Sequence, residues 1–131
     1  MYQLIHCGMV SIVAKLERLA VACFLREFKA FAAKNGLGIF ERRNYMQTLA
    51  GLGILPNDAK EIILDLTPEN YYKGLGAGTR ENEQICEFGT WVGEDEIYIK
   101  LLMDTGDERA FCFSFHKAER AIAYPFADTV G

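Results

Sequence analysis

Apolar side chains recur at steps of three and four residues in the first part of the chain. The series runs through Val13, Leu16, Ala20, Cys23, Phe24, Phe28 and Phe31. Such spacing places side chains on one face of a helix, which we predict over roughly residues 10–34. Asn35-Gly36 should end this helix, because glycine readily adopts the left-handed conformation of a helix C-cap. The phenylalanines of this face are expected to pack in the core.

Short apolar runs separated by cap and turn residues come next. Gly38–Glu41 is typical of a short strand. A helix capped by Asn44 should run to about Leu52, where Gly51 and Gly53 bring it to a stop. Pro56 is expected to open another helix, because proline is favoured at the first helical position.

The following segment combines a helix-start signal with a glycine-rich stretch. Thr67-Pro68-Glu69 places a capping threonine before a proline, which predicts a short helix. That helix should carry Tyr71, Tyr72 and Lys73. Gly74–Thr79 contains three glycines and is expected to be a mobile loop.

In the last third of the chain the apolar period changes to two, which is typical of strands. The predicted strands are Gln84–Val92, Glu96–Leu102 and Ala110–His116. The two links between them are short and rich in turn residues, so the strands should form an antiparallel meander. Since helices precede strands, the predicted class is α+β, with the N-terminal helices packed on one face of the sheet.

Alternation along the strands assigns each side chain to one of two faces. The predicted core-facing residues are Cys86, Phe88, Ile97, Ile99, Leu101, Phe111, Phe113 and Phe115. The opposite face should gather Glu87, Tyr98, Lys100, Ser114 and His116, together with Cys112. Directly opposed residues on neighbouring strands lie about 5 Å apart at Cβ, so this polar face is the candidate site.

Length and charge restrict the class of protein. The chain has 131 residues, half of them apolar, which suits one domain spanning residues 1–131. Within it we expect an N-terminal helix in residues 1–36 and a core in residues 38–126. The net charge of −4 argues against a general nucleic-acid-binding protein. Any RNA binding must therefore depend on a local basic cluster.

The cysteines and the N-terminal segment bear on the compartment. Cys7, Cys23, Cys86 and Cys112 show no C-x-x-C spacing, so we expect reduced, mostly buried thiols and no metal site. The apolar segment Leu4–Val13 lacks a preceding basic residue, and charged residues follow too soon for a membrane span. We therefore expect a lead-in to the first helix in a cytoplasmic protein with no membrane partner.

The polar face of the predicted sheet suits RNA cleavage without a metal ion. In that reaction the 2′-hydroxyl loses a proton, the 5′-oxygen gains one, and the phosphorane charge must be stabilised. Histidine titrates near neutral pH, so His116 is a candidate acid or base, with Glu87 as the complementary base. Tyr98 could donate a hydrogen bond or stack on a nucleobase.

Basic side chains near this face are candidates for binding the phosphates. The expected substrate-binding residues are Lys100, Arg80, Lys117 and Arg120. Lys73, just before the glycine-rich stretch, could also hold the phosphate in the transition state. We expect neither a cofactor nor a metal in this mechanism.

Three other interpretations of the same residues stay open. Glu, Lys and Tyr are common on an ordinary solvated sheet face, with no chemistry attached. His116 could be a structural histidine hydrogen-bonded to Glu119. His116, Glu87 and Glu119 could also form a carboxylate–histidine metal site, although one histidine with scattered carboxylates is poor spacing for zinc.

Seven segments carry a resemblance to a known family by their order and spacing. They are Thr48–Gly53, Ala59–Thr67, Glu69–Gly74, Glu87–Gly89, Glu96–Leu101, Phe113–Glu119 and Tyr124–Phe126. Together they cover roughly residues 38–126, and in this arrangement they resemble the MqsR family of toxins.

The resemblance implies a RelE-like ribonuclease fold, in which helices pack on one side of a curved antiparallel sheet. It also implies a type II toxin that cleaves mRNA and is neutralised by a cognate antitoxin of helix-turn-helix or zinc-finger type. Lys73 and Tyr98 fall on a functional lysine and a functional tyrosine of the family. His116 stands where the best-studied members carry a lysine, and Glu87 falls near their active glutamine.

The N-terminal helix is longer than the resemblance leads us to expect. It is therefore a candidate surface for homodimerisation or for antitoxin docking. The acidic balance of the chain favours an alternative function, a non-catalytic interaction or regulatory protein that binds an antitoxin-like partner.

Overall fold

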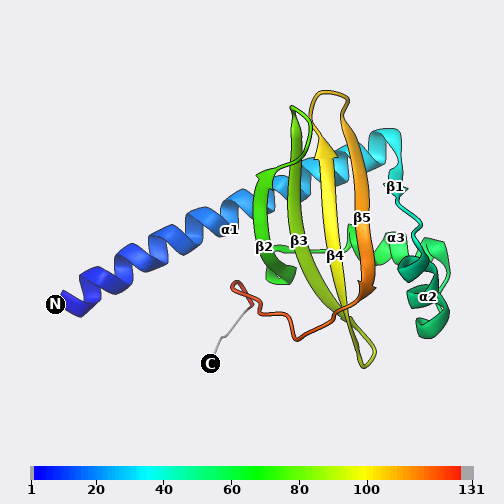
Figure 1. Ribbon diagram of the computed structural model, residues 1–131. Helices are drawn as coiled ribbons and strands as arrows, with labels where there is room; N and C mark the ends of the chain where they lie inside the picture. Colours follow the sequence, from blue (N-terminus) through cyan, green and yellow to red (C-terminus); the bar gives the residue numbers. More distant parts are fainter. Residues whose placement is uncertain (1, 128–131) are drawn as a thin grey trace.

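The computed structural model describes residues 2–127, with side chains from residue 12 onward apart from residue 43. It shows an α+β arrangement in which helices pack against a five-stranded mixed sheet (Figure 1). The helices are α1 (Tyr2–Asn35), α2 (Arg43–Leu52), α3 (Pro56–Leu64) and the short 3₁₀ helix η1 (Pro68–Asn70). The strands are β1 (Leu37–Ile39), β2 (Tyr71–Ala77), β3 (Glu83–Val92), β4 (Asp95–Asp104) and β5 (Arg109–Lys117).

The strand order in the sheet is β1-β5-β4-β3-β2. The β3–β4–β5 meander is antiparallel as predicted, but β1 runs parallel to β5, so the prediction of a purely antiparallel sheet is wrong at this edge. Figure 1 shows why: α1 delivers the chain to the end of the sheet where β5 begins, so β1 runs the same way as β5.

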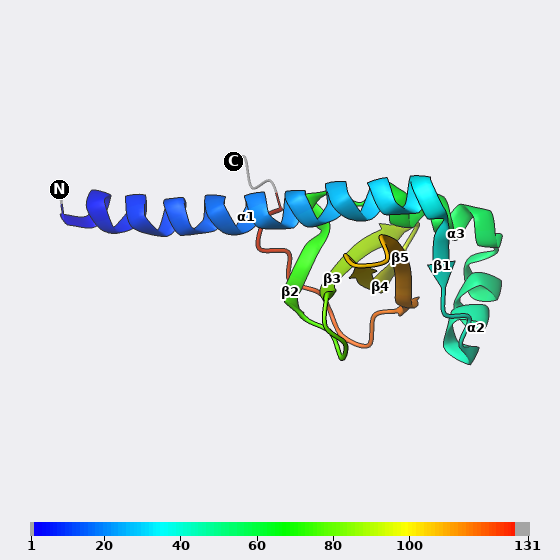
Figure 2. The ribbon, with the colours of Figure 1, turned by 90° about the horizontal axis from the view of Figure 1, so that it is seen from above.

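Helix α1 begins earlier than predicted. Its backbone is helical from Tyr2, so the predicted start near residue 10 is wrong. At about 1.5 Å per residue its length is roughly 50 Å. The C-terminal half lies along one face of the sheet and the N-terminal half extends past β2 (Figure 2). Gly36, with φ +87°, confirms the predicted C-cap. Within residues 2–127 no helix is long and apolar enough to cross a membrane.

The buried face of α1 differs from the predicted one in its first half. Phe24, Phe28 and Phe31 are buried as predicted, together with Val21 and Leu25. The other members of the predicted series are exposed: Val13, Leu16, Ala20 and Cys23. The N-terminal half of α1 extends beyond the sheet, so the domain does not cover the apolar side chains there. Cys23 lies between the buried residues Val21 and Phe24 and is exposed because it is on another side of the helix.

The starts of α2 and α3 depend on different local signals. Arg42 is the N-cap of α2, so the predicted cap Asn44 lies inside the helix. Gly53 ends α2 with φ +69°, as predicted, whereas Gly51, the other predicted stop, lies inside the helix. Helix α3 opens at Pro56 as predicted, and the Asp58 carboxylate accepts a 2.8 Å hydrogen bond from the backbone N–H of Leu55.

The segment predicted as a short helix and a glycine loop is the edge strand β2. Helix η1 ends at Asn70, and Tyr71–Ala77 pairs antiparallel with β3. Two bulges interrupt the pairing, and Gly74 and Leu75 both have φ of +97°. Bulges commonly use such conformations, and glycines lack the apolar alternation that marks a strand. Lys73 therefore lies on a strand, and its register partner is Glu87.

Strand β5 contains a bulge that divides its side chains into two phases. The register steps from Lys100↔Ser114 to Leu101↔Cys112, which leaves Phe113 as the extra residue. On the C-terminal side of the bulge the predicted faces are correct, because Phe115 is buried and His116 faces outward.

On the N-terminal side of the bulge the predicted faces of β5 are wrong. Ala110 and Cys112 are buried, whereas Phe111 and Phe113 are only half-buried and lie against Phe40. A one-residue change of register moves every following side chain to the other face of the sheet. Two of the three predicted core phenylalanines therefore lie on the outer face, the side of the sheet opposite α1.

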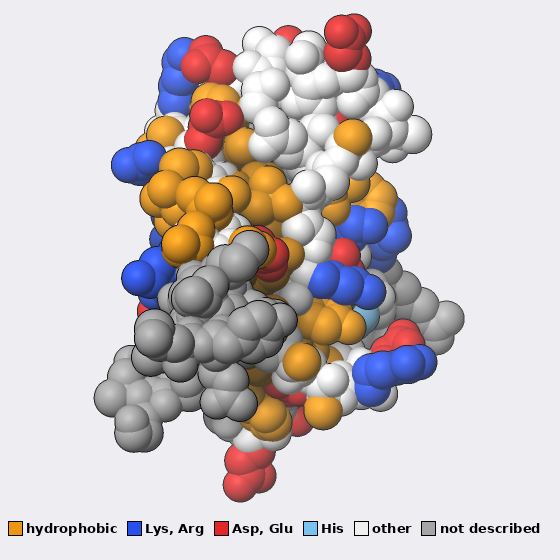
Figure 3. Space-filling model, turned by 90° about the vertical axis from the view of Figure 1, so that its left-hand side faces the viewer, with side chains coloured by type: hydrophobic (Ala, Val, Ile, Leu, Met, Phe, Trp, Pro, Cys, Tyr) orange, Lys and Arg blue, Asp and Glu red, His pale blue; other side chains and the backbone are white. Residues whose placement is uncertain are grey.

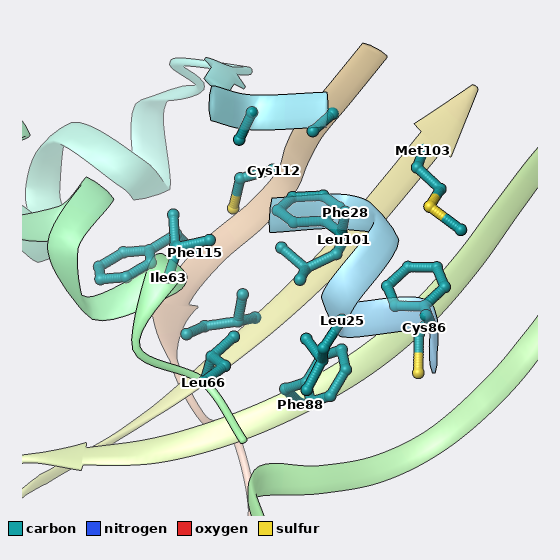
Figure 4. Packing of buried hydrophobic residues seen from close by; sticks show 14 of the residues in the cluster. Leu25, Phe28, Ile63, Leu66, Cys86, Phe88, Leu101, Met103, Cys112 and Phe115 are labelled. Atoms are coloured by element: carbon teal, nitrogen blue, oxygen red, sulfur yellow. The ribbon is translucent and has the colours of Figure 1, made fainter. Parts of the chain in front are cut away.

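The core fills the space between α1 and the sheet and extends to α3. Figure 4 shows Leu25 and Phe28 of α1 close to Phe88 and Leu101 of the sheet. Ile63, Leu66 and Phe115 continue this layer beside α3. Burial of this apolar surface on one side of the sheet leaves the outer face available for a site.

The cysteines agree only in part with the prediction of buried thiols. Cys86 and Cys112 are fully buried, and burial raises the pKa of each thiol to about 12. Cys23 is exposed, and the side chain of Cys7 lies outside the described residues.

Candidate functional site

An open pocket lies on the outer face of the sheet, at the end where β5 finishes. Its volume is about 310 Å³. Residues from β2, β3, β4, β5 and the segment after β5 line it: Tyr72, Lys73, Glu87, Tyr98, His116, Ala118, Glu119, Arg120 and Ile122. All four predicted catalytic residues (Lys73, Glu87, Tyr98 and His116) and the predicted substrate-binding residue Arg120 are therefore in one pocket.

Strand register explains why these side chains meet. Tyr98 lies directly between Gly89 and His116 on the neighbouring strands. The next row along the sheet contains Lys73 and Glu87. Gly89 adds no side chain to the first row, and Ile122 and Tyr124 from the segment after β5 lie close over that position.

A hydrogen bond joins the two rows. The Tyr98 hydroxyl donates to Glu87 Oε1 at 2.5 Å. Burial, followed by this hydrogen bond and the charge of Glu87, raises the pKa of Tyr98 far above its usual range. Tyr98 therefore keeps its proton and holds the Glu87 carboxylate in place, so it does not act as a phenolate base.

The orientation of His116 leaves one ring nitrogen for chemistry. Its Nδ1 lies 2.9 Å from the backbone carbonyl oxygen of Lys117. A carbonyl only accepts hydrogen bonds, so Nδ1 carries a proton and Nε2 is the nitrogen that can exchange one with a substrate. The ring packs on Tyr98, with centroids 5.2 Å apart. The alternative in which His116 is hydrogen-bonded to Glu119 is therefore not what the structure shows, because the bond of Nδ1 is to the Lys117 carbonyl.

The pocket has one wall made by the segment after β5, residues 118–127, which we call the tail. Glu96 holds it on the outer face: its carboxylate accepts the Ile122 backbone N–H at 3.0 Å and the Tyr124 hydroxyl at 2.7 Å. Phe126 then stacks on Tyr71 with ring centroids 5.0 Å apart. The tail thereby brings Arg120 into the pocket. Because the tail is not a strand, the alternation of side chains along strands could not predict this position.

Gly89 lets the tail lie close to the sheet. A Cβ atom at this position would lie 2.6 Å from Ile122 Cδ1 and 2.7 Å from the Tyr124 hydroxyl oxygen. Sequence reasoning missed Gly89, Glu96 and Ile122 because their roles depend on where the tail crosses the sheet. The segment Tyr124–Phe126, rich in aromatic residues, was the one available signal that the tail packs on the domain.

The other predicted substrate-binding cations lie outside this pocket. Arg80 is in the β2–β3 turn, and Lys117 pairs with Asp95 at 3.3 Å. Lys100 is one row away from the Tyr98–His116 row on the same face, and its Nζ lies 5.4 Å from the centre of the Phe113 ring. Figure 3 shows a histidine side chain at the surface with Lys or Arg side chains beside it.

The metal-site interpretation gains no support from the geometry. Across the described part of the chain, no group of three or more His, Cys, Asp or Glu side chains is placed to hold a metal ion. His116, Glu87 and Glu119 line the same pocket but do not converge as ligands.

Comparison with known proteins found no matching family model, no similar curated protein and no similar solved structure.

Proposed function

We propose that the protein is a metal-independent endoribonuclease that cleaves single-stranded mRNA, the toxin of a type II toxin–antitoxin pair. One observation carries this proposal: the carboxylate of Glu87, the phenol of Tyr98 and the imidazole of His116 share an open pocket with two cations. A carboxylate and an imidazole are the acid–base pair that 2′-hydroxyl attack needs. Two cations beside them suit a reaction at a phosphate.

The proposed reaction moves two protons. The Glu87 carboxylate takes the proton of the 2′-hydroxyl, and the 2′-oxygen attacks the adjacent phosphorus. His116, as imidazolium, donates the Nε2 proton to the departing 5′-oxygen, and the P–O5′ bond breaks. The products are a 2′,3′-cyclic phosphate and a 5′-hydroxyl, so both protons are accounted for. A general acid or base typically contributes about 10²–10⁴-fold to such a rate.

The remaining pocket residues have supporting roles in this scheme. Lys73 and Arg120 stabilise the additional negative charge of the phosphorane. Tyr98 is a positioning residue, because its hydroxyl is already donated to Glu87 and its ring packs on His116. Its loss should therefore lower the rate less than the loss of either group that transfers a proton.

Cleavage of a fluorescent, unstructured RNA in the presence of EDTA tests the mechanism. We expect His116→Ala and Glu87→Gln each to lower kcat by about 10²–10⁴-fold, and mass spectrometry of wild-type products to show the cyclic phosphate. Lys60→Ala, an exposed charge change on α3, is the matched control and should be neutral. If His116→Ala and Tyr98→Phe cleave as fast as the wild type, this site assignment is wrong.

The toxin assignment is supported by the ordered resemblance of residues 38–126 to the MqsR family. We propose on the same basis a RelE-like arrangement of the sheet, action on mRNA in the cytoplasm, and inhibition by an antitoxin of helix-turn-helix or zinc-finger type. Expression of the chain alone should stop growth, and co-expression of the adjacent small reading frame should restore it. Unimpaired growth with active-site residues intact would contradict the toxin role.

The alternative function is a non-catalytic interaction or regulatory protein that binds an antitoxin-like partner, and α1 offers an interaction surface that either function could use. Ile12, Leu16 and Leu19 are 59%, 62% and 59% exposed. With Cys23 they follow steps of four, three and four, the spacing of a coiled-coil seam. Because successive helical residues turn by about 100°, this row lies on the side of α1 away from the buried row that includes Phe24.

We infer that the occupant of this seam is a second copy of the chain. The seam repeats every seven residues, so an identical helix offers it a matching apolar row. Dimerisation through α1 is compatible with the nuclease role, because the pocket lies on the outer face of the sheet and α1 lies on the other.

A further inference from the structure

The outer face of the sheet carries a second group of side chains that the pocket does not use. Three phenylalanine rings gather where β1 and β5 meet: Phe40 lies 4.9 Å from Phe113 and 6.0 Å from Phe111, measured between ring centroids. Phe40 is 40% exposed, and the other two rings are half-buried. We call this group the aromatic face.

Cations lie beside the two half-buried rings of the aromatic face. The Arg42 guanidinium carbon lies 4.3 Å from the centre of the Phe113 ring, and Lys100 Nζ lies 5.4 Å from the same centre. Arg109 lies 5.2 Å from the centre of the Phe111 ring. None of these three cations has a carboxylate within 4.0 Å among residues 12–127, where the ion pairs involve Arg18, Lys34 and Lys117.

Three features of the backbone position the aromatic face. The Phe40 backbone N–H donates to the Cys112 carbonyl at 3.0 Å, which extends the parallel contact between the two segments. A Cβ atom on Gly38 would lie 2.7 Å from Phe111 Cδ1, so the glycine allows that ring to lie across β1. The β5 bulge supplies the third element, because it turns Phe111 and Phe113 to the outer face.

From these observations we propose that the aromatic face binds the unpaired nucleotides of the RNA chain that flank the cleaved bond. Planar rings and a guanidinium provide stacking surfaces for bases of any sequence. Three unpaired cations provide the local positive charge that an acidic chain needs in order to hold phosphates. The proposal rests on the nuclease function for the identity of the ligand, a single-stranded RNA.

The aromatic face is continuous with the pocket. His116 and Phe111 lie opposite Tyr98 and Leu102, four positions apart on β4, which corresponds to about 13 Å at 3.3 Å per residue. Stacked bases advance by about 3.4 Å each, so several nucleotides span this distance. Lys100, in the row between them, would contact the phosphates that link the two regions.

Binding is best measured in a His116→Ala background, so that the RNA stays intact. The probe is a fluorescein-labelled, unstructured 12-nucleotide RNA followed by fluorescence anisotropy, with a dinucleotide as the short ligand. We expect Phe40→Ala to weaken binding of the long RNA by about fivefold to 100-fold, the range seen for loss of one stacked base. Dinucleotide binding should stay within twofold, because a dinucleotide fills only the pocket.

Arg42→Ala provides a second, electrostatic readout. Loss of one phosphate contact should reduce the slope of log Kobs against log salt by about 0.7 for a single strand. Arg42→Lys keeps the charge but not the planar surface, so it should restore the salt slope and only part of the affinity. Leu55→Ala, which is 70% exposed, and Lys60→Ala are the matched apolar and charged controls.

The outcomes separate the two proposals. Phe113→Leu removes the aromatic ring but keeps much of the apolar volume, so it tests stacking in case alanine at this position unfolds β5. Thermal unfolding shows whether each variant is folded. Unchanged affinity in Phe40→Ala, Arg42→Ala and Phe113→Leu, with His116-dependent cleavage intact, would overturn the aromatic face and leave the nuclease standing. If the wild-type chain cleaves no RNA but these variants bind RNA more weakly, the aromatic face is an RNA-binding surface and the proposed nuclease function is wrong.

Discussion

Substitution of Gly89 by alanine tests how the tail is held over the pocket. Gly89 is buried on β3, and an added Cβ would lie 2.6 Å from Ile122 Cδ1 and 2.7 Å from the Tyr124 hydroxyl oxygen. Favourable carbon contacts need about 3.5–4.0 Å, so the tail must move away by about 1 Å. Ile122 can change rotamer, whereas the Tyr124 hydroxyl is fixed by its bond to Glu96.

The expected energy follows from what that movement breaks. A hydrogen bond to a charged group contributes about 1.5–3 kcal/mol, and Glu96 accepts one from the Tyr124 hydroxyl and one from the Ile122 backbone. Overpacking of a buried position costs about 1–3 kcal/mol. We therefore expect Gly89→Ala to lower the free energy of unfolding by about 1–3 kcal/mol, with the largest change in the tail itself.

Two measurements separate a local effect from a global one. Hydrogen exchange followed by mass spectrometry should show faster exchange in residues 118–127 while the core strands stay protected, and urea unfolding gives the free energy. Cleavage assays should show a higher KM for RNA, because Arg120 leaves the pocket with the tail. A tail that exchanges as slowly as in the wild type, with unchanged stability, would refute this account of the pocket wall.

Gly51→Ala is the matched control. Gly51 lies inside α2, and a Cβ atom there would meet nothing within 4 Å. Alanine is favoured over glycine in a helix interior by about 0.5–1 kcal/mol, so this variant should be more stable than the wild type. The same substitution should thus change stability in opposite directions at the two positions.

Three further predictions follow from other parts of the molecule. Burial raises the pKa of Cys86 and Cys112 to about 12, so between pH 9 and pH 12 these thiols ionise only in the unfolded chain. The free energy of unfolding should therefore fall by about 1.4 kcal/mol per pH unit per thiol in this range. Urea unfolding measures this slope, and a Cys112→Val variant should show a smaller one. Leu16→Glu combined with Leu19→Glu should convert a dimer to a monomer in analytical ultracentrifugation at unchanged thermal stability, and a wild-type monomer would contradict the α1 seam. Glu87→Gln should bind RNA more tightly than the wild type while cleaving it more slowly, since it removes a negative charge and the base together; faster cleavage would show that Glu87 only repels RNA.

Sequence patterns correctly predicted the strands in which side chains alternate regularly and no bulge interrupts the backbone pairing. On β3 and β4 the alternation is uninterrupted, so Cys86, Phe88 and Ile99 are buried and Glu87 and Tyr98 face outward. Gly36 and Gly53 were also correct as helix ends, because few other residues tolerate the left-handed conformation, whereas Gly51 lies inside α2. Alternation on these two regular strands was therefore enough to predict that Glu87 and Tyr98 share the pocket.

The parts that were wrong are those in which tertiary contacts override local pattern. Strand β2 is rich in glycine and doubly bulged, so nothing in its side chains marks it as a strand. The parallel pairing of β1 depends on where α1 delivers the chain, which no local pattern records. The position of Arg120 depends on Glu96 holding the tail, a contact between segments that have no shared periodicity.

The bulge at Phe113 explains why the predicted faces of β5 are correct at one end of the strand and wrong at the other. Alternation counted from the C-terminal end of β5 is correct as far as Ser114, so His116 was assigned to the outer face correctly. Beyond the bulge every assignment inverts, which brings the small side chains of Ala110 and Cys112 beneath the helices and turns two phenylalanine rings outward. An aromatic–small alternation fits the core in either phase, so hydrophobicity could not choose between them. The two rings that appeared to be core residues are, for the same reason, the stacking surface proposed for the RNA.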